Sequence, residues 1–186
     1  GVLFAKQMVH LNSDTLGMLR ALIENKAQSA LIGLIYDPAS AEAAHKAGVG
    51  AEIELELGAL SHWKNETSLK TKFFVQSLGD GNFMGTGPMW GGANMQLGLM
   101  AALRVDDIEV LVSSKKMQLA DKSIIRHLGI EPSDRKIIVV KSSVHFRADF
   151  DDIAEETIVA AAPGPNAADH RDLPYQNLRP SLRITP

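Results

Sequence analysis

Apolar and polar positions in the first fifty residues predict a helix, a strand and a second helix. Residues 15–25 place apolar side chains three and four positions apart, which is the spacing of one helical face. Residues able to cap this helix come just before it: Asn12, Ser13 and Asp14. Residues 30–36 form an apolar run of strand length, and Pro38 suits the first position of a helix that Gly48 would end.

The middle of the chain has the pattern of strands joined by turns. Residues 51–57 alternate glutamate with apolar residues, which predicts a half-exposed strand whose carboxylates are a solvated face rather than metal ligands. Residues 69–78 are a second strand candidate, followed by a hairpin turn at residues 79–82. Residues 95–105 and 108–113 are expected to form a further hairpin.

In the last part of the chain, the pattern predicts a helix, a strand and another helix. Residues 121–128 are expected to form a short helix that Gly129 ends. Residues 136–140 are a β-branched run typical of a buried strand, and the acidic segment 146–156 has helical character. These elements indicate an α/β (α+β) fold: a mixed β-sheet with long antiparallel hairpins and helices packed against it.

One domain is expected over residues 13–162. Residues 163–186 are irregular and contain several prolines, so they are predicted to be an extended C-terminal strap of the same domain. Residues 1–12 are interpreted as an atypical or truncated N-terminal segment. Because the chain starts at Gly1 without an initiator methionine or the flanks of a signal peptide, a fragment or a processed product is expected.

Composition argues against several classes of function. The net charge is −3, the pI is about 6.1 and no run of Lys or Arg occurs, so no nucleic-acid partner is expected. The chain has no cysteine, which excludes disulfides, thiolate metal sites and a cysteine nucleophile. No apolar run approaches the roughly 20 residues of a membrane span, so no membrane partner is expected. We expect a cytoplasmic protein.

A glycine-rich segment, residues 85–92, carries no nucleotide-binding signature. It lacks both the G-x-G-x-x-G pattern before a helix and the Lys-Ser/Thr pair of a P-loop. Such a segment could line a cleft or could simply join two strands. The second interpretation is favoured.

The histidines do not form a local metal site. All six are scattered, without an H-E-x-x-H motif or a closely spaced pair: His10, His45, His62, His127, His145 and His170. Glu42 and His45 have a spacing that can hold a metal on a helix, but plain surface is the favoured interpretation there. No G-x-S-x-G elbow of a serine hydrolase occurs either. The sequence therefore predicts no metal ligand and no complete active site in this chain.

A polar segment directly follows the strand predicted at residues 136–140. Five of its residues are candidates for contact with an anion or a carboxylate group: Lys141, Ser142, Ser143, His145 and Arg147. A strand that ends in a polar turn before a helix presents unpaired backbone N–H groups, which attract anions. The alternative is that Ser142 or Ser143 caps the helix and that the two cations are solvated.

Several motifs are distributed over nearly the whole chain, from about Asn12 to Pro186. The most specific is Val140-Lys-Ser-Ser-Val-His-Phe-Arg147. The others are shorter: Ser13-Asp-Thr15, Ala47-Gly-Val-Gly-Ala-Glu52, Gly85-Thr-Gly-Pro-Met89, Leu103-Arg-Val105, Gln118 and Asp172-Leu-Pro-Tyr175. These motifs resemble the C-terminal domain of the MlrC family, microcystinase-C-like zinc metallopeptidases named for an enzyme that degrades linearised microcystin.

The resemblance implies a division of labour within a longer protein. The zinc ligands are expected in a larger N-terminal catalytic domain, so no cofactor is expected in this chain and zinc is expected in the full-length protein. This domain would pack against that partner and wall a cleft for small peptides. The residues implied in substrate binding are the five named above together with Gln118, Asp14 and Thr15, and His145 is the catalytic candidate. The alternatives are a non-catalytic scaffold that mediates homo-oligomerisation and a small-anion binding module.

Overall fold

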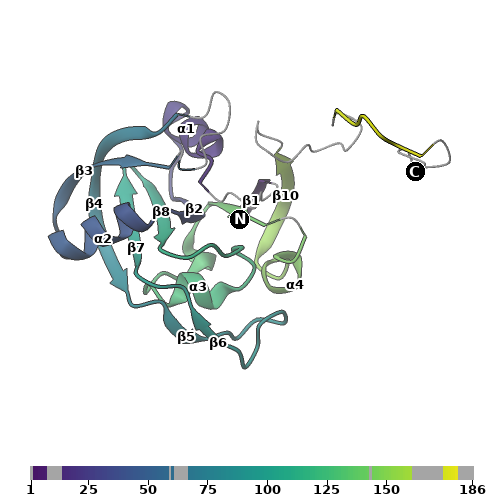
Figure 1. Cartoon of the computed structure of the whole chain (residues 1–186). Helices are drawn as coiled ribbons and strands as arrows, with labels where there is room; N and C mark the ends of the chain where they lie inside the picture. The colour runs from purple at the N-terminus through teal and green to yellow at the C-terminus, as the bar shows by residue number, and fades with distance from the viewer. Residues whose placement is uncertain are drawn as a thin grey trace.

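The computed structural model has a mixed eight-stranded sheet, with helices on both of its faces (Figure 1). It describes residues 2–7, 14–58, 60, 67–142, 144–160 and 174–179. The strand order is β10-β1-β9-β2-β8-β7-β4-β3, and β5 and β6 form a separate two-stranded sheet. The strands are β1 (Val2–Gln7), β2 (Ala30–Tyr36), β3 (Glu52–Leu57), β4 (Leu69–Gly79), β5 (Asn82–Met84), β6 (Asn94–Gln96), β7 (Met100–Val105), β8 (Ile108–Ser113), β9 (Ile137–Lys141) and β10 (Ala154–Ala160).

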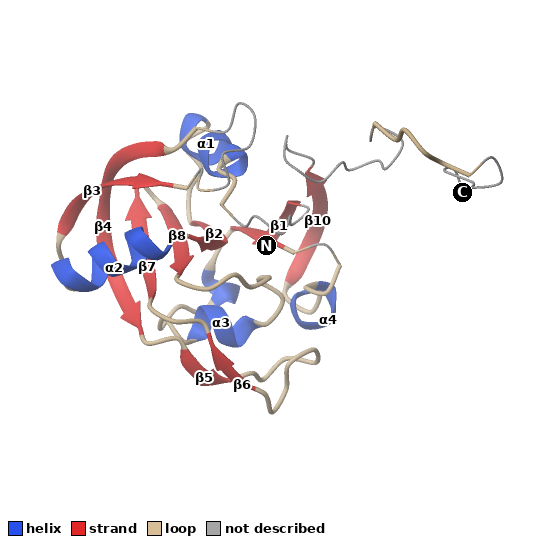
Figure 2. Ribbon diagram, in the orientation of Figure 1, coloured by secondary structure: helices blue, strands red, loops and turns tan. Residues whose placement is uncertain are grey.

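The sheet has a parallel half and an antiparallel half. Strands β10, β1, β9, β2 and β8 run parallel, and β7, β4 and β3 continue the sheet by antiparallel pairing. The helices are α1 (Gly17–Glu24), α2 (Pro38–Ala47), α3 (Lys122–Arg126) and α4 (Arg147–Phe150), with a 3-10 turn at Pro132–Asp134 (Figure 2). The mixed α/β fold with antiparallel hairpins is therefore confirmed.

Alternating residues of the central strands supply two hydrophobic cores. Leu111 of β8 and Ile138 of β9 point to the face covered by α3 and α4, where Phe150 is buried. Val110 and Val139 point to the other face, which α1 and α2 cover. Since strands buried on both faces need apolar residues at every position, the near-continuous apolar runs of β2, β8 and β9 follow from their central places in the sheet.

Several predicted elements are confirmed nearly to the residue. Strand β2 has its predicted bounds, and α2 begins at Pro38, where the Asp37 carboxylate accepts a bond from the backbone N–H of Ser40 at 2.9 Å. Gly48 ends α2 with a positive φ of 86° that favours glycine. Strand β3 exposes its three glutamates, and the glycine-rich segment joins β5 to β6, as predicted.

The helix predicted over residues 146–156 is wrong beyond its first turn. Helix α4 ends at Phe150, and residues from Ala154 form β10, which pairs in parallel with β1. Pairing with another strand overrides a weak local helical preference, and the β-branched run from Thr157 to Val159 suits a strand. The sequence pattern did not predict a strand at the residues that form β1.

One turn prediction, one strand prediction and one cap prediction also need correction. The turn at residues 79–82 exists, but β5 leaves the main sheet to pair with β6 instead of returning along β4. The strand predicted from residue 95 is divided between β6 and β7, with a break at residues 97–99. Helix α1 starts at Gly17 and its N-cap residue is Leu16, so the cap position lies two residues after Asp14. Asn12 and Ser13 lie outside the described residues.

The remaining predictions for the chain ends fall largely outside the described residues. Residues 174–179 are described, and all six are exposed. No helix in the described part of the chain is long and apolar enough to cross a membrane.

Candidate functional site

The candidate site lies at the carboxyl end of the parallel strands, where the chain leaves two neighbouring strands in opposite directions. Gln7, the last residue of β1, is paired with Lys141, the last residue of β9. After β1 the chain goes to α1 on one face of the sheet, and after β9 it goes to α4 on the other face. In open α/β sheets, ligands commonly bind outside the strand ends where the connections diverge in this way.

A single oxygen atom connects two of the predicted site residues. The Ser142 hydroxyl donates to Gln118 Oε1 at 3.2 Å, and His145 Nδ1 lies 3.2 Å from the same oxygen. Because this oxygen accepts, Nδ1 carries the proton, and in the neutral imidazole Nε2 is the acceptor. His145 is exposed, whereas Ser142 is fully buried. The arrangement presents one imidazole nitrogen to solvent in a fixed tautomer.

Lys141 occupies the interior rather than the surface. It is only 2 % exposed, and its ammonium donates to Thr15 O at 2.7 Å and to Thr15 Oγ1 at 2.9 Å. Asp14 and Thr15 are buried as well. The alternative in which Lys141 is solvated is therefore wrong, and its contacts join the end of β9 to the segment that precedes α1.

Arg147 makes its contacts within the segment of α4. Its guanidinium is 3.6 Å from Asp151 Oδ2 and stacks over the Phe146 ring, with its carbon 5.6 Å from the ring centroid. Helix α4 has no side-chain cap, so Ser142 does not cap it as the alternative interpretation supposed. Ser143 falls outside the described residues.

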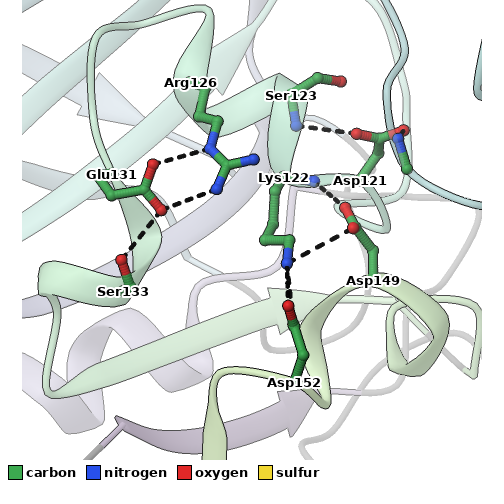
Figure 3. A network of polar contacts seen from close by, with 9 residues as sticks. Asp121, Lys122, Ser123, Arg126, Glu131, Ser133, Asp149 and Asp152 are labelled. Atoms are coloured by element: carbon green, nitrogen blue, oxygen red, sulfur yellow. Dashed lines mark hydrogen bonds and ion pairs between the residues drawn. The ribbon is translucent and has the colours of Figure 1, made fainter.

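A polar network that the sequence pattern did not predict holds the segment after His145 in place; it is buried at Asp121 and Lys122 and exposed at Asp152 (Figure 3). Asp121 caps α3 by accepting from the Ser123 N–H at 2.9 Å, and its second oxygen accepts from the Gly87 N–H at 2.8 Å. Asp149 accepts from the Lys122 N–H at 2.5 Å. The start of α3 is thus the shared anchor of the glycine-rich loop and of α4.

Lys122 supplies the positive charge of this network. Its ammonium is 2.9 Å from both carboxylate oxygens of Asp152 and 3.7 Å from Asp149 Oδ1. The hydrogen bond from Lys122 holds the pKa of Asp152 below its ordinary value. In the sequence, only the place of Asp121 at a predicted helix start indicates this network. The hydrogen bond from Gly87 to Asp121 could not be inferred, because the two residues are far apart in the chain.

An exposed ion pair extends the same region at the other end of α3. Arg126 donates to Glu131 through Nε at 2.8 Å and Nη2 at 3.0 Å, and Ser133 donates to the same carboxylate at 3.1 Å. These contacts lower the pKa of Glu131 to about 2, with the Arg126 hydrogen bond as the largest cause. Both side chains are partly exposed, so solvent screening limits the stabilisation to about 1 kcal/mol or less.

A polar pocket at the opposite end of the sheet is too small to rank as a ligand site. It is lined by Arg104, Asp107, Glu109 and Arg135 and measures about 240 Å³, below the roughly 300–1,000 Å³ of ligand pockets. Arg135 donates to both oxygens of buried Glu109, at 2.5 and 2.9 Å. We infer that this cluster has a structural role and stabilises this end of the sheet.

The described residues contain no group of three or more His, Asp or Glu side chains that could hold a metal ion. A zinc site needs three or four such ligands at about 2.0–2.2 Å, so the described part of this chain does not fit zinc. We predict that the 186-residue chain keeps less than one zinc per molecule after dialysis, as measured by elemental analysis. One tightly held zinc per chain would contradict this prediction.

Comparisons with known proteins match almost the whole chain. The family model described as MlrC C-terminus matches residues 12–177. Microcystinase C from Sphingomonas sp. is 25% identical over 162 residues, which cover 86% of this chain and 31% of that protein. A crystal structure of a candidate metallopeptidase from Mesorhizobium sp. BNC1 has the same fold, with a TM-score of 0.81 at 22% identity. The match covers 96% of this chain and 37% of that chain, so this chain spans about a third of each relative.

Proposed function

This chain belongs to the MlrC C-terminus family, and we propose that it is the C-terminal domain of a metallopeptidase in which it forms one wall of a peptide-binding cleft. The resemblance found in the Val140–Arg147 motif is thereby confirmed at the level of the family. Both relatives are about three times longer than the matched part, which supports a partner domain on the amino side of this one. Peptide hydrolysis by the longer protein is likewise proposed.

The observation that carries this proposal is the shared contact of Ser142 and His145 with Gln118 at the diverging ends of β1 and β9. A buried serine and a half-buried glutamine hold an exposed histidine in one tautomer. Fixing a general acid or base in this way lowers the cost of reaching the reactive geometry.

The site residues have different roles in this proposal. His145 Nε2 accepts or returns a proton at the peptide, and Arg147 contributes positive charge for a peptide carboxylate. Gln118 and Ser142 orient His145. Lys141, Asp14 and Thr15 are positioning residues, because Lys141 is buried and fixes the position of Thr15 relative to the end of β9. Ser143 is kept as a peptide contact on the basis of the family motif alone.

Zinc belongs to the amino-terminal part of the full-length protein in this proposal, because the described residues here do not fit it. A bound zinc ion would polarise the scissile carbonyl and activate water. The residues of this chain would orient the peptide and exchange a proton near that carbonyl. Small linear peptides, including linearised microcystin, are the proposed substrates.

The test is hydrolysis of short linear peptides by the full-length protein, with matched peptides that carry either a free or an amidated carboxyl terminus. We expect hydrolysis of both, with a preference of about tenfold for the free carboxylate, the value of one charge-assisted hydrogen bond of roughly 1.5 kcal/mol. Binding of the free peptide without cleavage would favour the anion-binding module instead. Neither binding nor cleavage would favour the scaffold.

A further inference from the structure

One continuous stretch of this chain, from Gly81 to Leu103, contains no charged residue, although 22% of the whole chain is charged. The stretch includes the hairpin of β5, the glycine-rich loop and β6. We call residues 81–99, which extend from the turn before β5 to the break before β7, the uncharged hairpin. Figure 1 shows β5 and β6 at one side of the molecule, separate from the main sheet.

The exposed surface of the uncharged hairpin combines apolar side chains with a complete lack of charge. Met84 is 56% exposed, Met89 41% and Leu99 37%, and Trp90 is half-buried against the core on the α3 side. The remaining exposed residues are neutral. A solvated surface normally has about a quarter to a third charged residues, whereas the core of a protein interface is depleted in charge and enriched in Met and aromatic residues.

The uncharged hairpin is also held rigidly, at both ends of α3. At its base, His127 accepts a hydrogen bond from the Gly81 N–H at 3.1 Å and stacks on Phe83 with ring centroids 4.6 Å apart. At its loop, Gly87 donates to Asp121 at 2.8 Å. A methyl group at Gly87 would lie 2.7 Å from Asp149 Oδ2, so the loop is packed directly against α4. A preorganised surface of this kind loses little entropy on binding a partner.

We propose that the uncharged hairpin is the surface on which the amino-terminal part of the longer protein docks, through an uncharged, apolar surface of its own. This inference rests on the proposed function. About two thirds of each relative lies outside the part matched here, which provides a partner in the same polypeptide. The two edges of the main sheet suit that role less well because both carry charge. Strand β3 exposes three glutamates, and β10 exposes Glu155 and Glu156 beside the exposed apolar side chains of Ile158 and Val159.

The methionines of this chain provide the test, because oxidation by hydrogen peroxide follows side-chain exposure. In the 186-residue chain, Met84 and Met89 should oxidise quickly, while Met95, at 5% exposed, and Met100, at 0%, should resist and serve as internal controls. In the full-length protein we expect oxidation of Met84 and Met89 to slow by about tenfold or more. Mass spectrometry of the digested protein measures each rate separately.

Three outcomes would overturn the proposal. Equal rates in the two proteins would leave the hairpin without a docked partner. Protection that grows with the concentration of the 186-residue chain would assign the surface to a second copy. Protection that needs added peptide would assign it to the substrate. Peptide hydrolysis is measured on the same full-length sample, so active protein with reactive Met84 and Met89 would reject this inference and leave the proposed function standing.

A matched pair of variants separates docking from folding. Met89→Glu places a charge on the proposed interface, and Val49→Glu places one on the turn between α2 and β3, where Val49 is 63% exposed. In the full-length protein, Met89→Glu should restore fast oxidation of Met84, and Val49→Glu should not. In the 186-residue chain, both variants should have the same denaturation midpoint as the wild type. Continued protection of Met84 in Met89→Glu would contradict the proposal.

Discussion

Replacement of His145 by alanine in the full-length protein is expected to lower kcat for peptide hydrolysis by about 10²–10⁴-fold, the usual contribution of a general acid or base. The reason is the fixed tautomer: Gln118 Oε1 lies 3.2 Å from Nδ1, so Nε2 is the atom presented outward. Since His145 is exposed, its loss removes little packing, and the free energy of unfolding should change by about 0.5 kcal/mol or less.

A second histidine provides the control for this experiment. His45 lies on α2 and donates from Nε2 to the Met100 carbonyl at 3.0 Å, away from the ends of β1 and β9. His45→Ala should keep kcat and reduce stability modestly, so the two variants should show opposite patterns of activity and stability. Full activity in His145→Ala would contradict the catalytic role proposed for His145. The contact with Gln118 would then be purely structural.

Elements whose limits are encoded by neighbouring residues could be predicted from the sequence. Helix α2 is an example: Asp37 caps its start, Pro38 occupies its first position, and Gly48 ends it with a φ of 86°. Strand β2 is another, because a central strand of a parallel sheet is apolar on both faces. In both cases the residues that decide the boundary lie within a few positions of it.

Elements that depend on distant partners could not be predicted in the same way. Strand β1 lies between β9 and β10, both near the other end of the chain, and its short apolar pattern carries no sign of that pairing. The helix predicted over residues 146–156 extends into the first three residues of β10, where pairing with β1 decides the outcome. Tertiary hydrogen bonds, not local preference, define these two strands.

The same distinction between local and distant determinants applies to the candidate site. The sequence brought attention to the end of β9 because polar residues follow a buried strand there, and the structure places Ser142 and His145 together at that end. The sequence could not show that Lys141 turns inward to Thr15, since a lysine after a strand is usually solvated. Nor could it show that Gly87 and Asp121 meet, because no spacing rule relates residues that far apart.

The contact between Gly87 and Asp121 leads to the largest stability change that we predict. Asp121→Ala removes the acceptor of two buried N–H groups, those of Ser123 and Gly87. A lost helix cap costs about 0.5–2 kcal/mol and a buried unsatisfied donor about 1–3 kcal/mol, so the unfolding free energy should fall by about 2–4 kcal/mol. Urea denaturation of the 186-residue chain measures this change.

Two further variants show whether the loss comes from these two hydrogen bonds. Asp121→Asn keeps one acceptor oxygen, so its unfolding free energy should lie between those of the wild type and Asp121→Ala. Asp134→Ala removes an exposed carboxylate from the nearby 3-10 turn and should change stability by no more than about 0.5 kcal/mol. Hydrogen exchange at the Gly87 amide should accelerate in Asp121→Ala, since exchange follows local opening. If Asp121→Ala unfolds like Asp134→Ala, the start of α3 does not anchor the glycine-rich loop, and the rigidity attributed to the uncharged hairpin must come from His127 alone.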